Sequence, residues 1–195
     1  MEDKNKPIVF LVHGYNGSPK IFGYFKETFE KSGYRVVMPS FPVQTDITID
    51  RYFEVFDEFR NKLGDNTIAI GHSIGNIMLL KYLAKNNIAI RGYVSLAGFG
   101  EPFVNEGRDD LNGVIAPLRL TDEEIAKAPN LIGQAVSIYS DDDHIVPFDV
   151  LKKYPAVIGA RPLFIPGIGH MGKKSGLEQL PEVVDIVNDL LKTTK

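Results

Sequence analysis

The sequence contains no cysteine and no tryptophan among its 195 residues. Without cysteine, the chain cannot form a disulfide-stabilised scaffold, nor a zinc or iron–sulfur site with thiolate ligands. An excess of either charge is also missing, because 22 Lys and Arg residues against 25 Asp and Glu residues leave a net charge of −3 and a pI near 5.8. Such a chain lacks the basic surface that nucleic acids require, so we expect no nucleic-acid partner.

Long hydrophobic runs are absent as well. No run approaches the roughly 20 apolar residues of a membrane span. The polar N-terminus, residues 1–6, precedes an apolar run too short for a secretory signal. We therefore expect no membrane insertion and a cytoplasmic setting. Hydrophobic residues make up 44% of the chain and charged residues 24%, which is typical of a globular domain. The length suits a single domain over residues 1–195.

Short apolar runs alternate with helical patterns along the chain. We expect six strands, at residues 7–12, 35–38, 67–70, 93–97, 135–139 and 163–165. Most of these runs are continuously apolar, which is typical of strands buried on both faces of a parallel sheet. Apolar stripes predict helices over residues 19–32, 49–63, 73–85 and 180–191. The alternation predicts an α/β fold, with a mostly parallel sheet of about six strands between helices on both faces.

The segment 99–130 does not fit this alternation. It mixes glycine, proline and charged residues, and it is long for a connection between two strands. A capping box of Thr121 and Glu124 predicts a short helix near its end. The segment is either an irregular crossover or a small cap over an active site. Candidate walls of a substrate pocket are Phe99, Phe103, Leu118 and His13.

The most informative stretch is Gly71-His72-Ser73-Ile74-Gly75, which follows an expected strand and opens an expected helix. Gly-x-Ser-x-Gly in this context is typical of a nucleophile elbow, in which serine sits on a sharp turn at the carboxyl end of a strand. The two glycines permit a close backbone approach, and the helix N-terminus directs N–H groups at a developing oxyanion. We infer that Ser73 is a nucleophile rather than part of a purely structural turn.

A serine nucleophile needs a general base, and the base needs an orienting carboxylate. The histidines are His13, His72, His144 and His170. His72 adjoins the nucleophile and should point away from it, and we expect His13 to support the loop after the first strand. His144 and His170 each follow the carboxyl end of a strand, as do the three aspartates 141–143. This is the edge where ligands gather in parallel sheets, and the chain order is Ser, Asp, His. We expect two of the three aspartates to form only a solvated turn.

With these motifs the chain resembles the α/β-hydrolase superfamily. It is similar, more narrowly, to the small serine hydrolases grouped with bacterial YdeN proteins and the animal retinoblastoma-binding serine hydrolase. The resemblance covers almost the whole chain, and it rests on the residues 12–15 (Val-His-Gly-Tyr), 71–75, 140–147 and 169–170.

The resemblance implies a three-layer α/β-hydrolase-like sandwich and assigns roles to individual residues. The acid is the aspartate four positions before the proline of an Asp-x-x-Val-Pro element, which is Asp143 here. His170 is then the base and His144 a loop residue. The backbone N–H groups of Tyr15 and Ile74 form the oxyanion hole.

Three competing motifs lead to no cofactor or metal. Gly167-x-Gly169-x-x-Gly172 matches a dinucleotide fingerprint, but no strand is expected after it. The same segment nearly spells a P-loop, which needs serine or threonine where this chain has Lys174. The cluster 141–144 has no known metal-ligand spacing.

The sequence therefore predicts a serine hydrolase of the carboxylesterase class that acts on a small-molecule acyl substrate. Ser73, His170 and Asp143 would form and hydrolyse an acyl-enzyme. The near-neutral charge of the chain weakly favours an uncharged or weakly charged ester. Two alternatives stay open. One is a catalytically idle hydrolase fold that binds another protein, and the other is acyl transfer or peroxidative chemistry by the same triad.

Overall fold

The strands form one parallel sheet, as the alternation of apolar runs predicts. The structure is a computed structural model that describes residues 6–43, 46–172 and 180–192, so residues 1–5, Lys173 and Lys174 lie outside the described residues. The strands are β1 (Ile8–Val12), β2 (Arg35–Val37), β3 (Thr67–His72), β4 (Gly92–Leu96), β5 (Gln134–Tyr139) and β6 (Arg161–Phe164). They lie in the order β2-β1-β3-β4-β5-β6, and every neighbouring pair is parallel.

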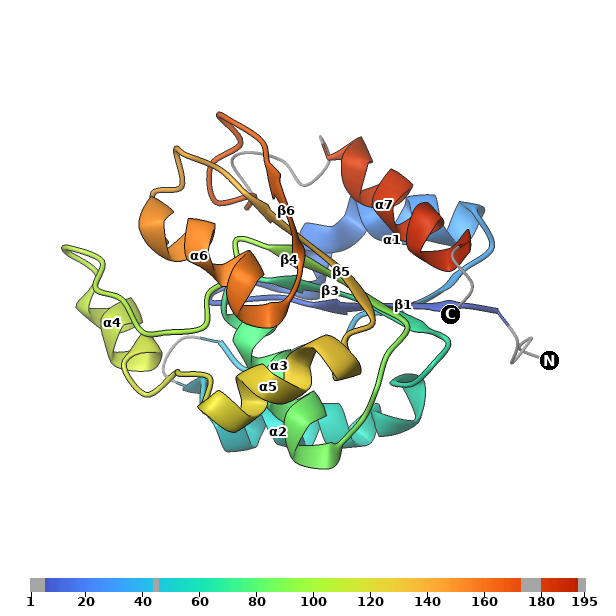
Figure 1. The fold of residues 1–195 in the computed structure, drawn as a ribbon, viewed down its shortest axis with the longest axis horizontal. Helices are drawn as coiled ribbons and strands as arrows, with labels where there is room; N and C mark the ends of the chain where they lie inside the picture. Colours follow the sequence, from blue (N-terminus) through green and yellow to red (C-terminus); the bar gives the residue numbers. More distant parts are fainter. Residues whose placement is uncertain (1–5, 44–45, 173–179, 193–195) are drawn as a thin grey trace.

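Helices cover both faces of this sheet (Figure 1). The helices are α1 (Gly23–Lys31), α2 (Ile49–Glu58), α3 (Ile74–Asn86), α4 (Asp109–Ile115), α5 (Asp122–Leu131), α6 (Phe148–Ile158) and α7 (Pro181–Lys192). Contacts pair α1 with α7 on one face and link α2, α3, α5 and α6 on the other. This division follows from right-handed crossovers. The chain moves toward one edge of the sheet from β1 to β2 and toward the other edge from β3 onward, so the connecting helices lie on opposite faces. The expected three-layer α/β sandwich is confirmed.

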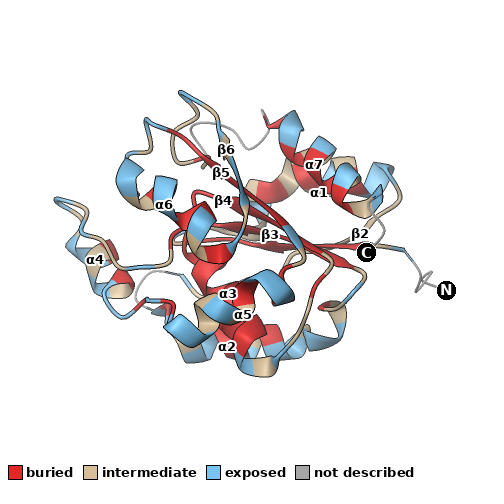
Figure 2. Cartoon of the chain, viewed as in Figure 1, coloured by how far each residue is buried: buried red, intermediate tan, exposed pale blue. Residues whose placement is uncertain are grey.

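Burial follows the position of each strand in the sheet (Figure 2). All residues of β1, β3 and β4 are buried, as their continuous apolar runs predict. The edge strand β6 is mostly exposed. Its Pro162 has no N–H to donate, and an edge strand tolerates that loss because one side of it has no partner. Within the described ranges, no helix is long and apolar enough to cross a bilayer.

Several helix boundaries differ from the sequence expectation. The first expected helix divides into a 3-10 turn at Pro19–Phe22 and α1, and the second ends at Glu58 before another 3-10 turn. The helix α6 was missed, although Leu151, Tyr154 and Ile158 repeat at helical spacing and are buried. A proline within α6 obscured the pattern, because proline removes a helical hydrogen bond.

The segment 99–130 contains two helices, α4 and α5. Its end forms the predicted helix α5, where Thr121 Oγ1 accepts from the N–H of Glu124 at 3.2 Å and Glu124 accepts from the N–H of Thr121 at 2.8 Å. Glu124 also pairs with Lys81 of α3 at 2.8 Å, so α5 belongs to the helical layer. The short helix α4, which was not predicted, lies apart from that layer at one end of the sheet (Figure 1).

Stacked aromatic rings join β1, α2 and α3 beneath the sheet. Phe56 is fully buried and lies at the centre, with ring centroids 4.8 Å from both Phe41 and Tyr82 and 6.2 Å from Phe10. Such pairs add to the free energy that burial of the rings contributes. The cluster therefore fixes α3 against β1, and the site described below lies at the start of α3 and in the loop after β1.

We predict that Phe56→Ala lowers the free energy of unfolding by about 3–5 kcal/mol, because it removes a buried ring and leaves a cavity. Phe164→Ala is the matched control, since that ring is 45% exposed on the edge strand, and it should cost about 1 kcal/mol or less. Chemical denaturation of both variants measures the difference. Equal losses would contradict the central role of this cluster.

Candidate active site

Ser73 lies on a strained turn between β3 and α3. Its backbone angles are φ 54° and ψ −126°, a region that costs a residue with a side chain on the order of 1–3 kcal/mol. Two hydrogen bonds hold the turn. The N–H of Ser73 donates to the carbonyl of Leu96 at 2.9 Å, and its own carbonyl accepts from Asn76 Nδ2 at 3.0 Å. The serine is therefore fixed at the carboxyl end of the central strand before any substrate arrives.

Both motif glycines are required by close contacts. A Cβ atom at Gly71 would stand 2.4 Å from Oδ1 of Asn76, and one at Gly75 would stand 2.6 Å from the carbonyl oxygen of Val12. Neither distance is compatible with a side chain, so the glycines allow α3 to start directly against the end of β1. The two glycines thus permit the close backbone approach that the sequence predicts.

A buried polar network supports the elbow, and sequence reasoning missed it. Asn76 is fully buried, and its Nδ2 also donates to the carbonyl of Leu96 at 3.0 Å. The hydroxyl of the buried Tyr93 donates to Asn76 Oδ1, which fixes the orientation of the amide. The available signal was an amide near the start of a helix whose residues 74–80 are otherwise apolar or glycine. A buried amide of that kind needs partners, because an unpaired one is costly.

Asp143 and His170 form a buried pair. His170 Nδ1 donates to Asp143 Oδ2 at 2.8 Å and lies 3.0 Å from Oδ1, and the aspartate side chain is only 1% exposed. Burial acts to raise the pKa of Asp143, but the hydrogen bond and charge of His170 and the N–H groups of Ile145 and Val146 outweigh it and hold the pKa below its usual value. The carboxylate stays ionised and holds the Nδ1 side of the His170 ring.

The other two aspartates hold the loop that carries His170, defined here as the histidine loop, residues 167–172. Asp141 Oδ1 accepts from the N–H of Gly167 at 3.1 Å, and Asp142 Oδ1 accepts from the N–H of Gly169 at 2.7 Å. Ser140 Oγ donates to the same oxygen of Asp142, and these bonds lower the pKa of that carboxyl. Both aspartates are more exposed than Asp143, as expected, but they form more than a solvated turn.

These three carboxylates turn toward different backbone groups instead of converging. Correspondingly, no group of three or more His, Asp or Glu side chains in the described part of the chain is arranged to hold a metal ion. The glycines of the apparent dinucleotide fingerprint belong to the histidine loop. That loop follows the last strand of the sheet, so it opens no β-α-β unit.

His72 joins the elbow to the histidine loop. Its Nε2 donates to the backbone carbonyl of His170 at 2.8 Å, and the two rings lie 4.9 Å apart. Burial, reinforced by the charge of His170, lowers the pKa of His72 to about 3. A neutral His72 therefore supports the loop. Sequence reasoning only excluded it as the base and did not find this contact.

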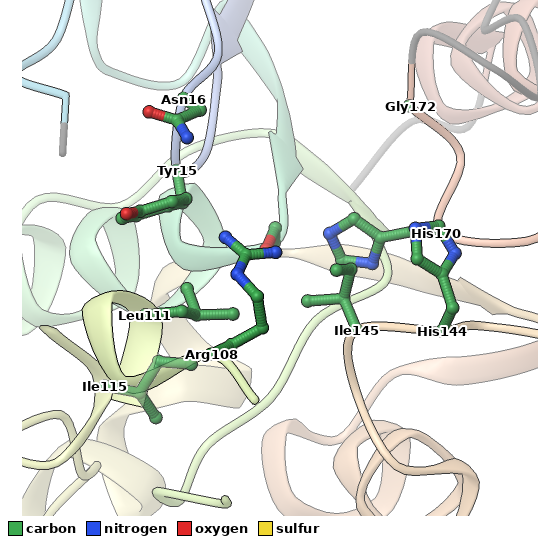
Figure 3. Close-up of a pocket in the computed structure, with 10 residues that line it drawn as sticks. Tyr15, Asn16, Arg108, Leu111, Ile115, His144, Ile145, His170 and Gly172 are labelled. Atoms are coloured by element: carbon green, nitrogen blue, oxygen red, sulfur yellow. The ribbon is translucent and has the colours of Figure 1, made fainter. Parts of the chain in front are cut away.

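A cavity of about 230 Å³ opens beside Ser73 and His170. Tyr15 and Asn16 lie on one side of it, and His144 and His170 on the opposite side (Figure 3). Its lining residues are Tyr15, Asn16, Ser73, Arg108, Leu111, Ile115, His144, Ile145, His170 and Gly172. The predicted residues Tyr15, Ser73 and His170 therefore meet in one pocket, and α4 contributes walls that the sequence did not suggest.

The residues expected from the sequence to wall the pocket lie elsewhere in the structure. None of His13, Phe99, Phe103 and Leu118 belongs to this lining. His13 is 1% exposed and its Nε2 accepts from the N–H of Phe41 at 2.9 Å, so it supports the neighbouring loop. Phe99 and Leu118 are buried, and Phe103 packs edge-on against Phe99. The apolar side chains of Phe99 and Leu118 pack in the core, because full burial stabilises them more than a half-open pocket does.

Comparison with known proteins identifies relatives of this fold. The family described as serine hydrolase matches residues 9–189. YdeN of Bacillus subtilis (strain 168), named as a hydrolase, is 22% identical over 189 residues, which cover 92% of this chain and 93% of that protein. The crystal structure of the B. subtilis ydeN gene product aligns with a TM-score of 0.84 at 22% identity, covering 96% of this chain and 100% of that one.

A structure from a study of Nitrososphaera gargenis carboxylesterases aligns with a TM-score of 0.72 at 16% identity, covering 98% of this chain and 92% of that one. At these identities the structural matches show a shared fold. The expected family and the α/β-hydrolase architecture are confirmed.

We predict that His72 makes the protein less stable as the pH falls. In the unfolded chain its pKa has the ordinary value of 6.5, whereas in the folded chain it is about 3. Between these values the unfolded state binds more protons, so the free energy of unfolding decreases with falling pH, by up to about 1.4 kcal/mol per unit. His72→Gln, which can still donate a hydrogen bond, should flatten the slope measured by denaturation between pH 6.5 and 4.5.

His144→Gln is the control for this measurement, because His144 is exposed. This variant should keep the slope of the original protein. Identical slopes in all three proteins would mean that His72 is not held neutral by burial.

Proposed function

The chain belongs to the serine hydrolase family, and on that premise we propose that it hydrolyses a small carboxylic ester, or a related acyl bond, through Ser73, His170 and Asp143. One observation carries this proposal: the strained elbow of Ser73 and the Asp143–His170 pair meet at a single pocket. Neither arrangement has another evident purpose in the fold. We further propose that the enzyme needs no cofactor and acts in the cytoplasm.

The proposed reaction proceeds in two halves. Ser73 Oγ attacks the acyl carbonyl while its proton passes to His170 Nε2. The tetrahedral intermediate collapses, the bond to the leaving oxygen breaks, and His170 returns the proton to that oxygen, so that an alcohol departs and acyl-Ser73 remains. A water molecule then gives a proton to His170 and attacks the acyl carbon. Collapse of the second intermediate breaks the bond to Oγ, returns the proton to Ser73 and releases the acid.

Asp143 acts on this reaction through His170. Its carboxylate holds the proton of the base on Nδ1, so that Nε2 presents a lone pair to the serine hydroxyl. When the base becomes doubly protonated, the same carboxylate stabilises its positive charge. The lowered pKa of Asp143 keeps the carboxylate ionised throughout.

Two backbone N–H groups are candidates for binding the oxyanion. Ile74 is the first residue of α3, and N–H groups in the first turn of a helix have no acceptor within the helix. Gly14 approaches the elbow so closely that a Cβ there would stand 2.8 Å from Ser73 Cβ. This contact brings the peptide between Gly14 and Tyr15 beside the nucleophile. We therefore propose the N–H groups of Tyr15 and Ile74 as the oxyanion hole.

The pocket supports an acyl substrate of modest size. Leu111 and Ile115 on α4 and Ile145 beyond β5 supply apolar surface next to the nucleophile. The Nitrososphaera structure, which comes from a study of carboxylesterases, shares this fold. Both observations favour an ester over the binding of a protein partner.

We predict that a fluorophosphonate probe labels Ser73, because the reagent traps an activated serine next to its base. Ser73→Ala should abolish both labelling and turnover of a short acyl ester, with a loss on the order of 10⁶ in kcat. Ser18→Ala, which alters a serine with no side-chain cap bond, is the control and should label normally. Labelling of neither the original protein nor the control would instead favour an idle fold that binds a partner.

We predict different effects for neighbouring aspartates. Asp143→Asn should lower kcat by about 10⁴, because an amide favours the wrong tautomer of the base. Asp142→Asn should lower it far less, since the amide oxygen can still accept from the Ser140 hydroxyl and the N–H of Gly169. Steady-state kinetics on one ester compares the two. If Asp142→Asn is the damaging change, the acid is misassigned.

A further inference from the structure

Among the described residues that line the pocket, Arg108 is the one permanently charged side chain. Of the ten lining residues, the others are aromatic, aliphatic, amide, hydroxyl, glycine or imidazole groups. Arg108 is the N-cap residue of α4, and its guanidinium reaches into the space between Tyr15 and the imidazoles of His144 and His170 (Figure 3). Neither the proposed triad nor the oxyanion hole uses this cation.

The guanidinium is fixed in place by two partners, Asp110 and the Tyr15 ring. Arg108 Nε donates to Asp110 Oδ1 at 3.1 Å, and Nη2 donates to Oδ2 at 3.2 Å. Its carbon also lies 5.7 Å from the centre of the Tyr15 ring, and the Tyr15 hydroxyl donates to Asp110 Oδ2 at 2.6 Å. A guanidinium has five N–H groups. The N–H groups on Nη1 have no acceptor among the described side chains and backbone, so they remain available to a ligand.

The carboxylates near the pocket are already occupied. Asp110 accepts from both Arg108 and Tyr15 and does not belong to the lining. The hydrogen bond from Arg108 is the main cause that holds the pKa of Asp110 well below its usual range. Asp143 lies behind His170 with 1% of its side chain exposed. Among the described lining residues, a bound molecule would therefore meet a cation and no carboxylate.

We propose that Arg108 binds an anionic group of the substrate, so that the preferred substrate is an ester bearing a carboxylate some bonds away from the scissile carbonyl. A carboxylate matches the planar fork of a guanidinium, and a hydrogen bond between two charged groups is stronger than one between neutral groups. The neighbouring Leu111 and Ile115 accommodate the methylene spacer between the two ends. The charge of the whole chain weakly favoured an uncharged ester, but the charge inside the pocket favours an anionic one.

This proposal rests on the proposed hydrolase function, so its test compares two esters that differ only in charge. The first pair is the 4-nitrophenyl monoester of hexanedioic acid and the same ester with the free carboxyl replaced by a carboxamide. We expect kcat/KM to be ~10-fold or more higher for the carboxylate. Arg108→Gln should reduce this ratio to near one, and added salt should reduce it in the original protein.

Arg119→Gln is the matched control, because Arg119 lines a different pocket near α5 and α6. This variant should keep the full ratio. A second pair moves the charge to the alcohol, with butyryl esters of 3-hydroxybenzoic acid and of its carboxamide. The pair with the larger ratio of kcat/KM for carboxylate over carboxamide shows whether the acyl part or the alcohol part of the substrate carries the carboxylate.

Two outcomes would overturn the proposal, and they are distinguishable. If both members of each pair are hydrolysed at the same rate, or if Arg108→Gln slows them equally, Arg108 acts only as a link between α4 and Tyr15, and the hydrolase function still holds. If no ester is hydrolysed and Ser73 resists the fluorophosphonate probe, the hydrolase function fails, and the substrate proposal fails with it.

Discussion

The left-handed backbone of Ser73 is the constraint on which the rest of the structure depends. The turn would relax if α3 could move, because its conformation is unfavourable for a residue with a side chain. It cannot move, since every residue from Ile74 to Ala84 is buried between the sheet and neighbouring helices. The absence of side chains at Gly71 and Gly75 lets the helix approach β1 and Asn76 fill the gap beneath the turn. The packing of the core thereby maintains a reactive geometry that the local chain would not adopt alone.

The proposed base, His170, is held near Ser73 by a second set of contacts, built mainly on hydrogen bonds. The histidine loop after β6 is held from one side by the side chains of Ser140, Asp141 and Asp142, and from the other by His72. The acidic residues accept N–H groups, while the neutral His72 donates to a carbonyl, so each backbone group meets a partner of the opposite polarity. This arrangement orients the His170 ring toward Asp143 through hydrogen bonds alone among the described residues.

The proposed binding groups and the proposed catalytic groups come from different parts of the fold. The proposed triad stands at the carboxyl ends of β3, β5 and β6, where the parallel sheet gathers it. The apolar walls of the pocket come largely from α4, a single short helix inserted in the crossover after β4. Its contact with Tyr15 through Asp110 places the specificity element beside a proposed oxyanion donor. A change in α4 can therefore alter what is bound while the elbow and the Asp143–His170 pair remain intact.

The sequence by itself determined the parallel α/β sandwich, the elbow at Ser73 and the Ser, Asp, His order, because each of these depends on short segments whose patterns are local. Apolar runs reveal buried strands, and glycines at positions 71 and 75 reveal a close approach. Only the tertiary structure decided the pocket walls, the roles of His72 and Asn76, and the position of Arg108. These depend on partners far apart in the chain, such as Tyr15 and Asp110 or His72 and the carbonyl of His170, 95 and 98 positions apart. No local pattern records such a pair, because the sheet and its helices bring the two residues together only after folding.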